Sequence, residues 1–508
     1  MICVRPMHIL GYKQMWLRLA LCLVLLGCSA SDAAPPTAED ASATQQVSTT
    51  GGVATGGNTS SGGVTETGGS GSATNAETGG MTASQQTGGQ SSAQSDASMI
   101  MDASTTDAAQ EMMSPPLDCG PIGVAIVDAG PPSNRVNYVI LADGYTETTI
   151  NTTLMTHIEN AMEERFSPEL GQPYLRYKNF VNICLLQTVS ETDGIGKGPT
   201  IFSCTGDDTS RLASCDTGTA QQELAANIPP DMMVDWHSIV LNNDAWWNTG
   251  SSWMLWSGGN MNGPKAALHE GGHGFHQLAD EYCASGTGTS CSNASGSSSD
   301  TMEYLEVNST ADMTNTAGKW DLWLGDEQVG LAVPNMGATG MQSTFRGSRY
   351  VDQGQYRPSG NSKMNSLFGD DLNTSYNAVS REKMVMDIWR YVEPIDSTNP
   401  PEGAVSNPAT LTAYVIDPEV INVDWSVDGA VISENGGASL NVASLGLSAG
   451  SHTISAFAYD NATTDLVRYR SGDCPNGTMP SMGGKDPCFG RQNWPRSQQT
   501  VTWDVTIP

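Results

Sequence analysis

Short runs of apolar residues, spaced by polar segments, begin at about residue 119 and continue to residue 398. Runs at 136–141, 180–186 and 237–241 predict buried strands because each is four to eight residues long and ends in turn residues. The first is followed by apolar residues at helical spacing, which predict a helix with Thr146 as its N-cap: Ile150, Leu154, Ile158 and Met162. Residues 252–256 predict an edge strand. Strands that alternate with helices indicate an α/β (α+β) domain over 118–398.

The pattern changes after Pro400 and Pro401 to short runs with a period of two. Three such runs predict strands at 423–427, 452–457 and 501–505, and Asp428-Gly429 predicts a turn between strands. The sequence therefore predicts a small all-β, immunoglobulin-like sandwich over 399–508. Its predicted inward residues are Trp425, Val427, Ile454, Ala456, Trp503 and Val505. No cluster of chemically reactive residues occurs in it, which indicates an accessory role.

The first 117 residues have neither pattern. Residues 1–28 combine basic residues with an apolar stretch that is too short to span a bilayer, as in an export signal. The stretch ends in Leu25-Leu26-Gly27-Cys28, which resembles a bacterial lipobox, so we expect Cys28 to carry a lipid anchor; the alternative is an ordinary cleaved signal. Residues 29–117 are rich in Ser, Thr and Gly with recurring Thr-Gly-Gly, and we expect a disordered tether.

The formal net charge of −31 argues against one class of partner. An acidic chain repels phosphate backbones, so nucleic acid is not an expected partner. The acidity is explained by solubility outside the cell.

Cysteine usage agrees with an oxidising compartment. Of the 11 cysteines, three lie in residues 1–28, and the eight that remain suggest up to four disulfides. Short sequence separations favour three pairs and leave Cys119 for Cys184: the three are Cys204–Cys215, Cys283–Cys291 and Cys474–Cys488. The absence of CxxC spacing disfavours a cysteine zinc site.

One helical segment carries the chemistry. His269, Glu270 and His273 form an HExxH motif after Asn262, a candidate cap, and Pro264, which suits the first helical turn. Residues four apart on a helix differ by about 40° and 6 Å, so both imidazoles can reach one metal ion. Zinc in catalytic sites takes such ligands with a third protein ligand and a water. Glu270 stands beside the first ligand and can act as general base toward the zinc-bound water.

The third ligand has several candidates. His276 lies about 10.5 Å along the axis from His269 and cannot share its ion on a straight helix. Asp280 and Glu281 are better placed if the helix ends near Gln277 and the chain folds back.

These stretches together resemble the bacterial IgA-peptidase family of zinc metallopeptidases. The resemblance rests on HEGGH at 269–273 and LADEY at 278–282, with 139–146, 356–358 and Met364 also fitting. It covers residues 119–395 or thereabouts. It implies a zincin-like catalytic domain, often with a β-sandwich behind it.

The resemblance also implies His269, His273 and Asp280 as zinc ligands and Glu270 as the base. One departure concerns the turn after the helix, where the family has a glycine and this chain has Gln277. Glu281 therefore stays a reserve candidate for the third ligand.

The sequence thus predicts an exported, zinc-dependent metallopeptidase, anchored in the cell envelope through Cys28 or released from it. Its expected partner is extracellular protein or peptide, and a monomer is expected. The alternative is a cell-surface adhesion protein that uses a zincin-like domain as a scaffold. An intact Glu270 favours the enzyme, because a scaffold does not need that carboxylate.

Overall fold

The computed structural model describes residues 115–283, 299–312, 319–320, 323, 344–365, 374–461, 466–467 and 497–508. The expected export signal, Cys28 and the expected tether at 29–117 lie outside these residues. Within the ranges given, no helix has the length and apolar character needed to cross a membrane.

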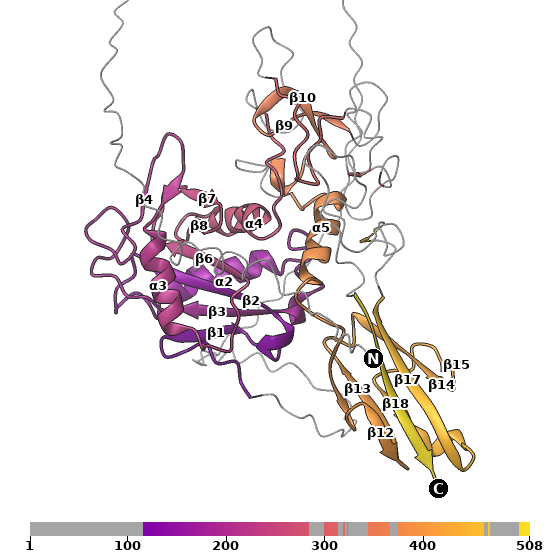
Figure 1. Ribbon diagram of the computed structural model, residues 1–508. Helices are drawn as coiled ribbons and strands as arrows, with labels where there is room; N and C mark the ends of the chain where they lie inside the picture. The colour runs from indigo at the N-terminus through magenta and orange to yellow at the C-terminus, as the bar shows by residue number, and fades with distance from the viewer. Residues whose placement is uncertain are drawn as a thin grey trace, which may run out of the picture. The chain divides into compact units, whose positions relative to one another are not determined.

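A six-stranded sheet organises residues 123–257 (Figure 1). Its strand order is β1-β3-β2-β6-β8-β7; the four inner strands run parallel, and both edge strands run antiparallel to their neighbours. The strands are β1 (Gly123–Val127), β2 (Val136–Asp143), β3 (Val181–Leu186), β6 (Trp236–Leu241), β7 (Asn248–Gly250) and β8 (Met254–Ser257). The mixture of helices and sheets confirms the α+β class.

Helices cover both faces of this sheet. All eight residues of β2 are buried, and alternate residues enter two different cores. Tyr138 and Ile140 pack in the core that contains residues of α2 (Thr153–Arg165) and α4 (Gly263–Gly274). Val139 and Leu141 pack in the other core, beside residues of α3 (Thr217–Asn227). A parallel strand buried on both faces reads as one continuous apolar run, which is why β2 is so clear in the sequence.

The expected elements differ from the structure in two places. The helix predicted from Thr146 begins only at Thr153, because residues 146–152 form turns closed by bonds such as Thr149 N to Thr146 O at 3.0 Å. The strand expected at the edge, β8, pairs on both sides. The strand at this edge of the sheet is β7, which has three polar or small residues and shows no apolar pattern.

Two further sheets form from strands within residues 395–460 and 498–507 and bury one common core. Trp425, Ile454, Ala456, Trp503 and Val505 are buried as expected, while Val427 is half-buried. The sheets have the orders β11-β13-β16 and β12-β18-β17-β14-β15. Their strands are β11 (Ile395–Asn399), β12 (Gly403–Ser406), β13 (Thr410–Val415), β14 (Ile421–Val427), β15 (Ala430–Ser433), β16 (Ser439–Asn441), β17 (Gly450–Asp460) and β18 (Gln498–Ile507).

The remaining elements connect and support these sheets. A two-stranded hairpin, β9 (Phe345–Ser348) and β10 (Val351–Arg357), and the helix α5 (Ala378–Ile388) come between α4 and the C-terminal strands. The other elements are β4 (Thr205–Gly206), β5 (Ala213–Ser214) and the 3-10 turns η1 (Pro132–Asn134), η2 (Lys178–Phe180), η5 (Lys363–Asn365) and η7 (Val442–Leu445).

Two of the expected disulfides are confirmed, Cys119–Cys184 and Cys204–Cys215. Cys283 is also disulfide-bonded. Its expected partner Cys291, and the expected pair Cys474–Cys488, lie outside the described residues.

Candidate metal centre

The HExxH segment forms α4, which packs closely against the sheet because two glycines stand inside the motif. A methyl group at Gly271 would lie 2.9 Å from a ring carbon of Trp236, and one at Gly272 would lie 2.5 Å from the sulfur of Met364. Larger residues would therefore push α4 away from both neighbours. Asn262 occupies the N-cap position, but its side chain makes no capping hydrogen bond; Pro264 sits in the first turn as expected.

Both imidazoles of the motif are oriented by backbone carbonyls. His269 Nδ1 lies 2.8 Å from the carbonyl oxygen of Lys363, and His273 Nδ1 lies 2.7 Å from that of Leu278. A carbonyl only accepts hydrogen bonds, so each Nδ1 carries a proton, and the neutral form of each ring presents the lone pair of Nε2 toward the cluster. The two Nε2 atoms are 3.2 Å apart.

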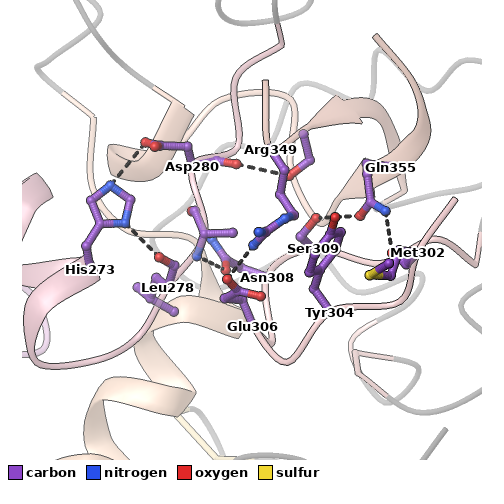
Figure 2. Close-up of polar contacts among 12 residues, drawn as sticks. His273, Leu278, Asp280, Met302, Tyr304, Glu306, Asn308, Ser309, Arg349 and Gln355 are labelled. Carbon is purple, nitrogen blue, oxygen red and sulfur yellow. Dashed lines mark hydrogen bonds and ion pairs between the residues drawn. The ribbon is translucent and has the colours of Figure 1, made fainter. Parts of the chain in front are cut away.

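The turn after α4 brings Asp280 to these nitrogens. Gln277 has a φ of 54°, the left-handed conformation that a glycine adopts easily, and Leu278 N closes the turn on Gly272 O at 2.9 Å. Asp280 Oδ1 then lies 3.0 Å from His269 Nε2 and 3.1 Å from His273 Nε2. Figure 2 shows His273 held between Asp280 and Leu278. The structure thus brings together the three expected ligands.

This donor set fits a divalent metal ion. His269, His273 and Asp280 form a cluster in which each residue offers one ligand atom. Ligands about 2.0–2.1 Å from one zinc-sized ion, at the tetrahedral angle, lie roughly 3.3 Å from one another. The observed separations of 3.0, 3.1 and 3.2 Å are close to that value. Carbonyl groups bonded to the far imidazole nitrogens are the usual outer contacts of metal-binding histidines.

The charges around the cluster also favour a cation. Burial lowers the pKa of His273, but the Asp280 carboxylate outweighs this and raises it to about 9. Burial raises the pKa of Asp280, but the two histidines outweigh it and hold it well below its usual range. Positive charge is therefore stabilised between these groups, as it would be on a bound ion.

Glu270 lies beside His273 of the cluster, next to β7. Its side chain makes no hydrogen bond within the part of the chain that the structure describes, and burial raises its pKa while the two histidines oppose the rise. The strand β7 approaches it closely, since a methyl group at Gly250 would lie 2.5 Å from Glu270 Oε2.

The other candidate ligands have different partners. Glu281 accepts hydrogen bonds from Asn308 at 2.9 Å, Ser362 at 2.6 Å and Asn377 at 2.8 Å, and its side chain is fully buried. His276 is buried between Tyr174 and Asp387. Neither residue belongs to the cluster of three donors.

One contact of the cluster was not expected from the sequence. The hydroxyl of Tyr350, in the turn between β9 and β10, donates a hydrogen bond to Asp280 Oδ2. Tyr350 is 70 residues from Asp280 and belongs to no recognisable motif, so only the folded chain brings it to the site.

Comparisons with known proteins agree with this geometry. Residues 124–338 match the family model described as IgA Peptidase M64. No curated protein sequence matches. A solved structure described as fibronectin(III)-like modules of Clostridium thermocellum CbhA shares 18% identity with this chain; the match covers 22% of this chain and 95% of that one, with a TM-score of 0.12. The family match confirms the resemblance seen in the motifs: residues 124–338 are similar to the IgA peptidase M64 family of peptidases.

Proposed function

We propose that this peptidase is a zinc-dependent metallopeptidase in which His269, His273 and Asp280 hold the ion. The observation that carries the proposal is the convergence of the Nε2 atoms of His269 and His273 and one Asp280 carboxylate oxygen within 3.2 Å. Zinc accepts this mixture of nitrogen and oxygen ligands, and three protein ligands leave a position open for chemistry. Asp280 is preferred to Glu281 because the carboxylate of Glu281 is already satisfied by amide and hydroxyl donors.

When bound, the ion would polarise the scissile carbonyl group and lower the pKa of the attacking water. Glu270 is the group on this chain that can take the proton from that water, because its carboxylate is next to His269 and has no competing hydrogen bond among the described residues. The same carboxylate would then deliver the proton to the leaving amine. His269 and His273 are held by Lys363 O and Leu278 O and need no rearrangement to keep their lone pairs aligned.

The surroundings of the cluster also support a zincin-like fold for the domain at 118–398. Met364 is buried against Gly272, and the carbonyl of the preceding Lys363 holds His269, so η5 forms the floor of the cluster. We propose that residues 399–508, an immunoglobulin-like sandwich, serve as an accessory domain.

The test of the proposal distinguishes loss of the metal ion from loss of the general base. Wild-type protein should hold about one zinc per chain and cleave members of a peptide library, and a chelator should abolish cleavage reversibly. Glu270→Gln should retain the zinc but lose activity by roughly 10²–10⁴-fold, the usual contribution of a general base. His273→Ala should lose the zinc itself. Wild-type protein without a transition metal, or Glu270→Gln with wild-type turnover, would contradict the proposal.

We also propose that the protein is exported and held at the cell envelope by a lipid on Cys28, with 29–117 as a tether and extracellular protein as substrate. The support is the lipobox-like end of the apolar stretch. Cells should produce a membrane-associated form that incorporates labelled fatty acid, and Cys28→Ala should remove the label. Label that persists in Cys28→Ala would refute the anchor.

A further inference from the structure

The turn between β9 and β10 has an unusual conformation for its residues. Ser348 pairs with Val351, so Arg349 and Tyr350 are the two central residues of a two-residue hairpin turn. Their φ values are 51° and 66°. A turn with positive φ at both central positions strongly favours Asn and Gly, and an ordinary side chain costs about 1–2 kcal/mol at each. A strained pair of large residues indicates that their side chains have a use.

The backbone of this turn is fastened to the segment that carries Asp280. Arg349 N donates to Asp280 O at 2.9 Å, and Tyr350 N donates to Tyr282 O at 3.0 Å. Ser348 Oγ donates to the same Asp280 carbonyl at 3.1 Å. These bonds fix the backbone of Tyr350 relative to the metal cluster.

The Arg349 side chain locks the turn from the other side. Its guanidinium group lies 3.7 Å from the ring centroid of Tyr304 and forms an ion pair with Glu306. Figure 2 shows Arg349 reaching from Asp280 to Glu306. The strain at Arg349 is thus offset by a cation–π contact and an ion pair.

Tyr350 has no comparable role in packing. Its side chain is 56% exposed, and its ring meets that of Tyr282 edge to face at 5.1 Å. Its hydroxyl donates to Asp280 Oδ2, while Asp280 Oδ1 is the atom that faces His269 and His273. The two oxygens of the Asp280 carboxylate therefore have different partners.

We propose that Tyr350 is a positioning residue for the metal centre, which holds the Asp280 carboxylate so that a single oxygen faces the ion. This inference rests on the proposed function. The hydroxyl group of Tyr350 restrains rotation of the Asp280 carboxylate. As a result Oδ2 would not occupy the coordination position that three protein ligands leave open. Loss of such an outer contact typically weakens metal binding by 10- to 100-fold.

The experiment measures zinc affinity of the full-length protein by competition with a chromogenic chelator. Tyr350→Phe should weaken zinc binding by about ten-fold or more and speed zinc release. The matched control is Tyr356→Phe on the same hairpin, where Tyr356 pairs with Thr310 through its backbone; it should bind zinc within two-fold of wild type. Tyr350→Phe with wild-type zinc affinity would overturn the inference, whereas wild-type protein that binds no zinc would overturn the proposed function.

A second variant separates positioning from a structural role. Tyr350→Gly relieves the left-handed conformation, so the metal-free variant should melt at or above the wild-type temperature. If Tyr350 served only the turn, this variant would keep its zinc affinity. We expect the opposite result, a sound fold with zinc affinity reduced as in Tyr350→Phe, and equal affinity in Tyr350→Gly and wild type would overturn the inference.

Discussion

Replacing Gly250 with alanine tests how closely β7 approaches the proposed catalytic groups. The added methyl group would lie 2.5 Å from Glu270 Oε2 and 2.7 Å from both Cβ and Cδ2 of His273. Ordinary contact begins at 3.4 Å, so these atoms must separate by 0.9 Å (3.4 − 2.5) and 0.7 Å (3.4 − 2.7). Either β7 moves outward or the side chains of α4 shift away from their present positions.

The size of the displacement sets the expected effect. Overpacking of this kind costs about 1–3 kcal/mol of folding free energy. A displacement of about 1 Å at a catalytic group can cost roughly 10²-fold in rate. We therefore expect Gly250→Ala to fold with reduced stability, and kcat/KM for a library-derived peptide to fall about 10- to 100-fold.

The assay compares kcat/KM, zinc content and melting temperature for Gly250→Ala and a control, Gly218→Ala. Gly218 lies in the first turn of α3, where an added methyl group meets only a side-chain oxygen of Asp216 at 3.2 Å. The control should keep wild-type activity. If Gly250→Ala also keeps wild-type activity and melting temperature, β7 does not lie against Glu270 and His273 as the structure places it.

Four further outcomes are expected. Gln277→Gly should raise the free energy of unfolding by about 0.5–1 kcal/mol, the left-handed strain less the extra entropy of a glycine chain, as chemical denaturation would measure. Removal of the Cys119–Cys184 bond, which closes a 65-residue separation, should cost about 4 kcal/mol by the same measurement. Burial raises the pKa of Asp387, but Lys383 outweighs it and holds the pKa below its ordinary value of 3.8. This stabilisation is therefore present at pH values well above 3.8 and is lost as the pH falls through the lowered pKa, and Asp387→Asn should flatten the acid limb of the stability profile. Limited proteolysis should cut within 29–117 and leave a compact fragment.

The sequence could predict the elements whose residues are buried on one or two faces. The strands β2, β3 and β6 are mainly apolar, and β14, β17 and β18 alternate with a period of two, so their positions follow from burial alone. The edge strand β7 has no such pattern, because it is short and built from Asn, Thr and Gly. Its position beside Glu270 depends on pairing with β8, which sequence patterns do not encode.

The candidate site divides in the same way. His269, Glu270 and His273 belong to one helical turn, so local geometry alone brings them together. Asp280 depends on the path of the turn after α4, and the sequence left it open beside Glu281. In the structure Gln277 adopts the left-handed conformation and turns the chain so that Asp280 lies at the two histidines, although no glycine in the sequence marks this turn.

The second glycine of HEGGH, Gly272, links the motif to Met364, about 90 residues later in the chain. With no side chain at Gly272, Met364 packs directly on the helix between the two histidines. That contact fixes η5, and the carbonyl oxygen of Lys363 in η5 accepts a hydrogen bond from His269 Nδ1. Met364 O accepts a hydrogen bond from Glu281 N at 2.8 Å, which ties the chain just after Asp280 to the same element. The first and third proposed ligands are therefore positioned by one short segment, and its closeness to α4 depends on Gly272.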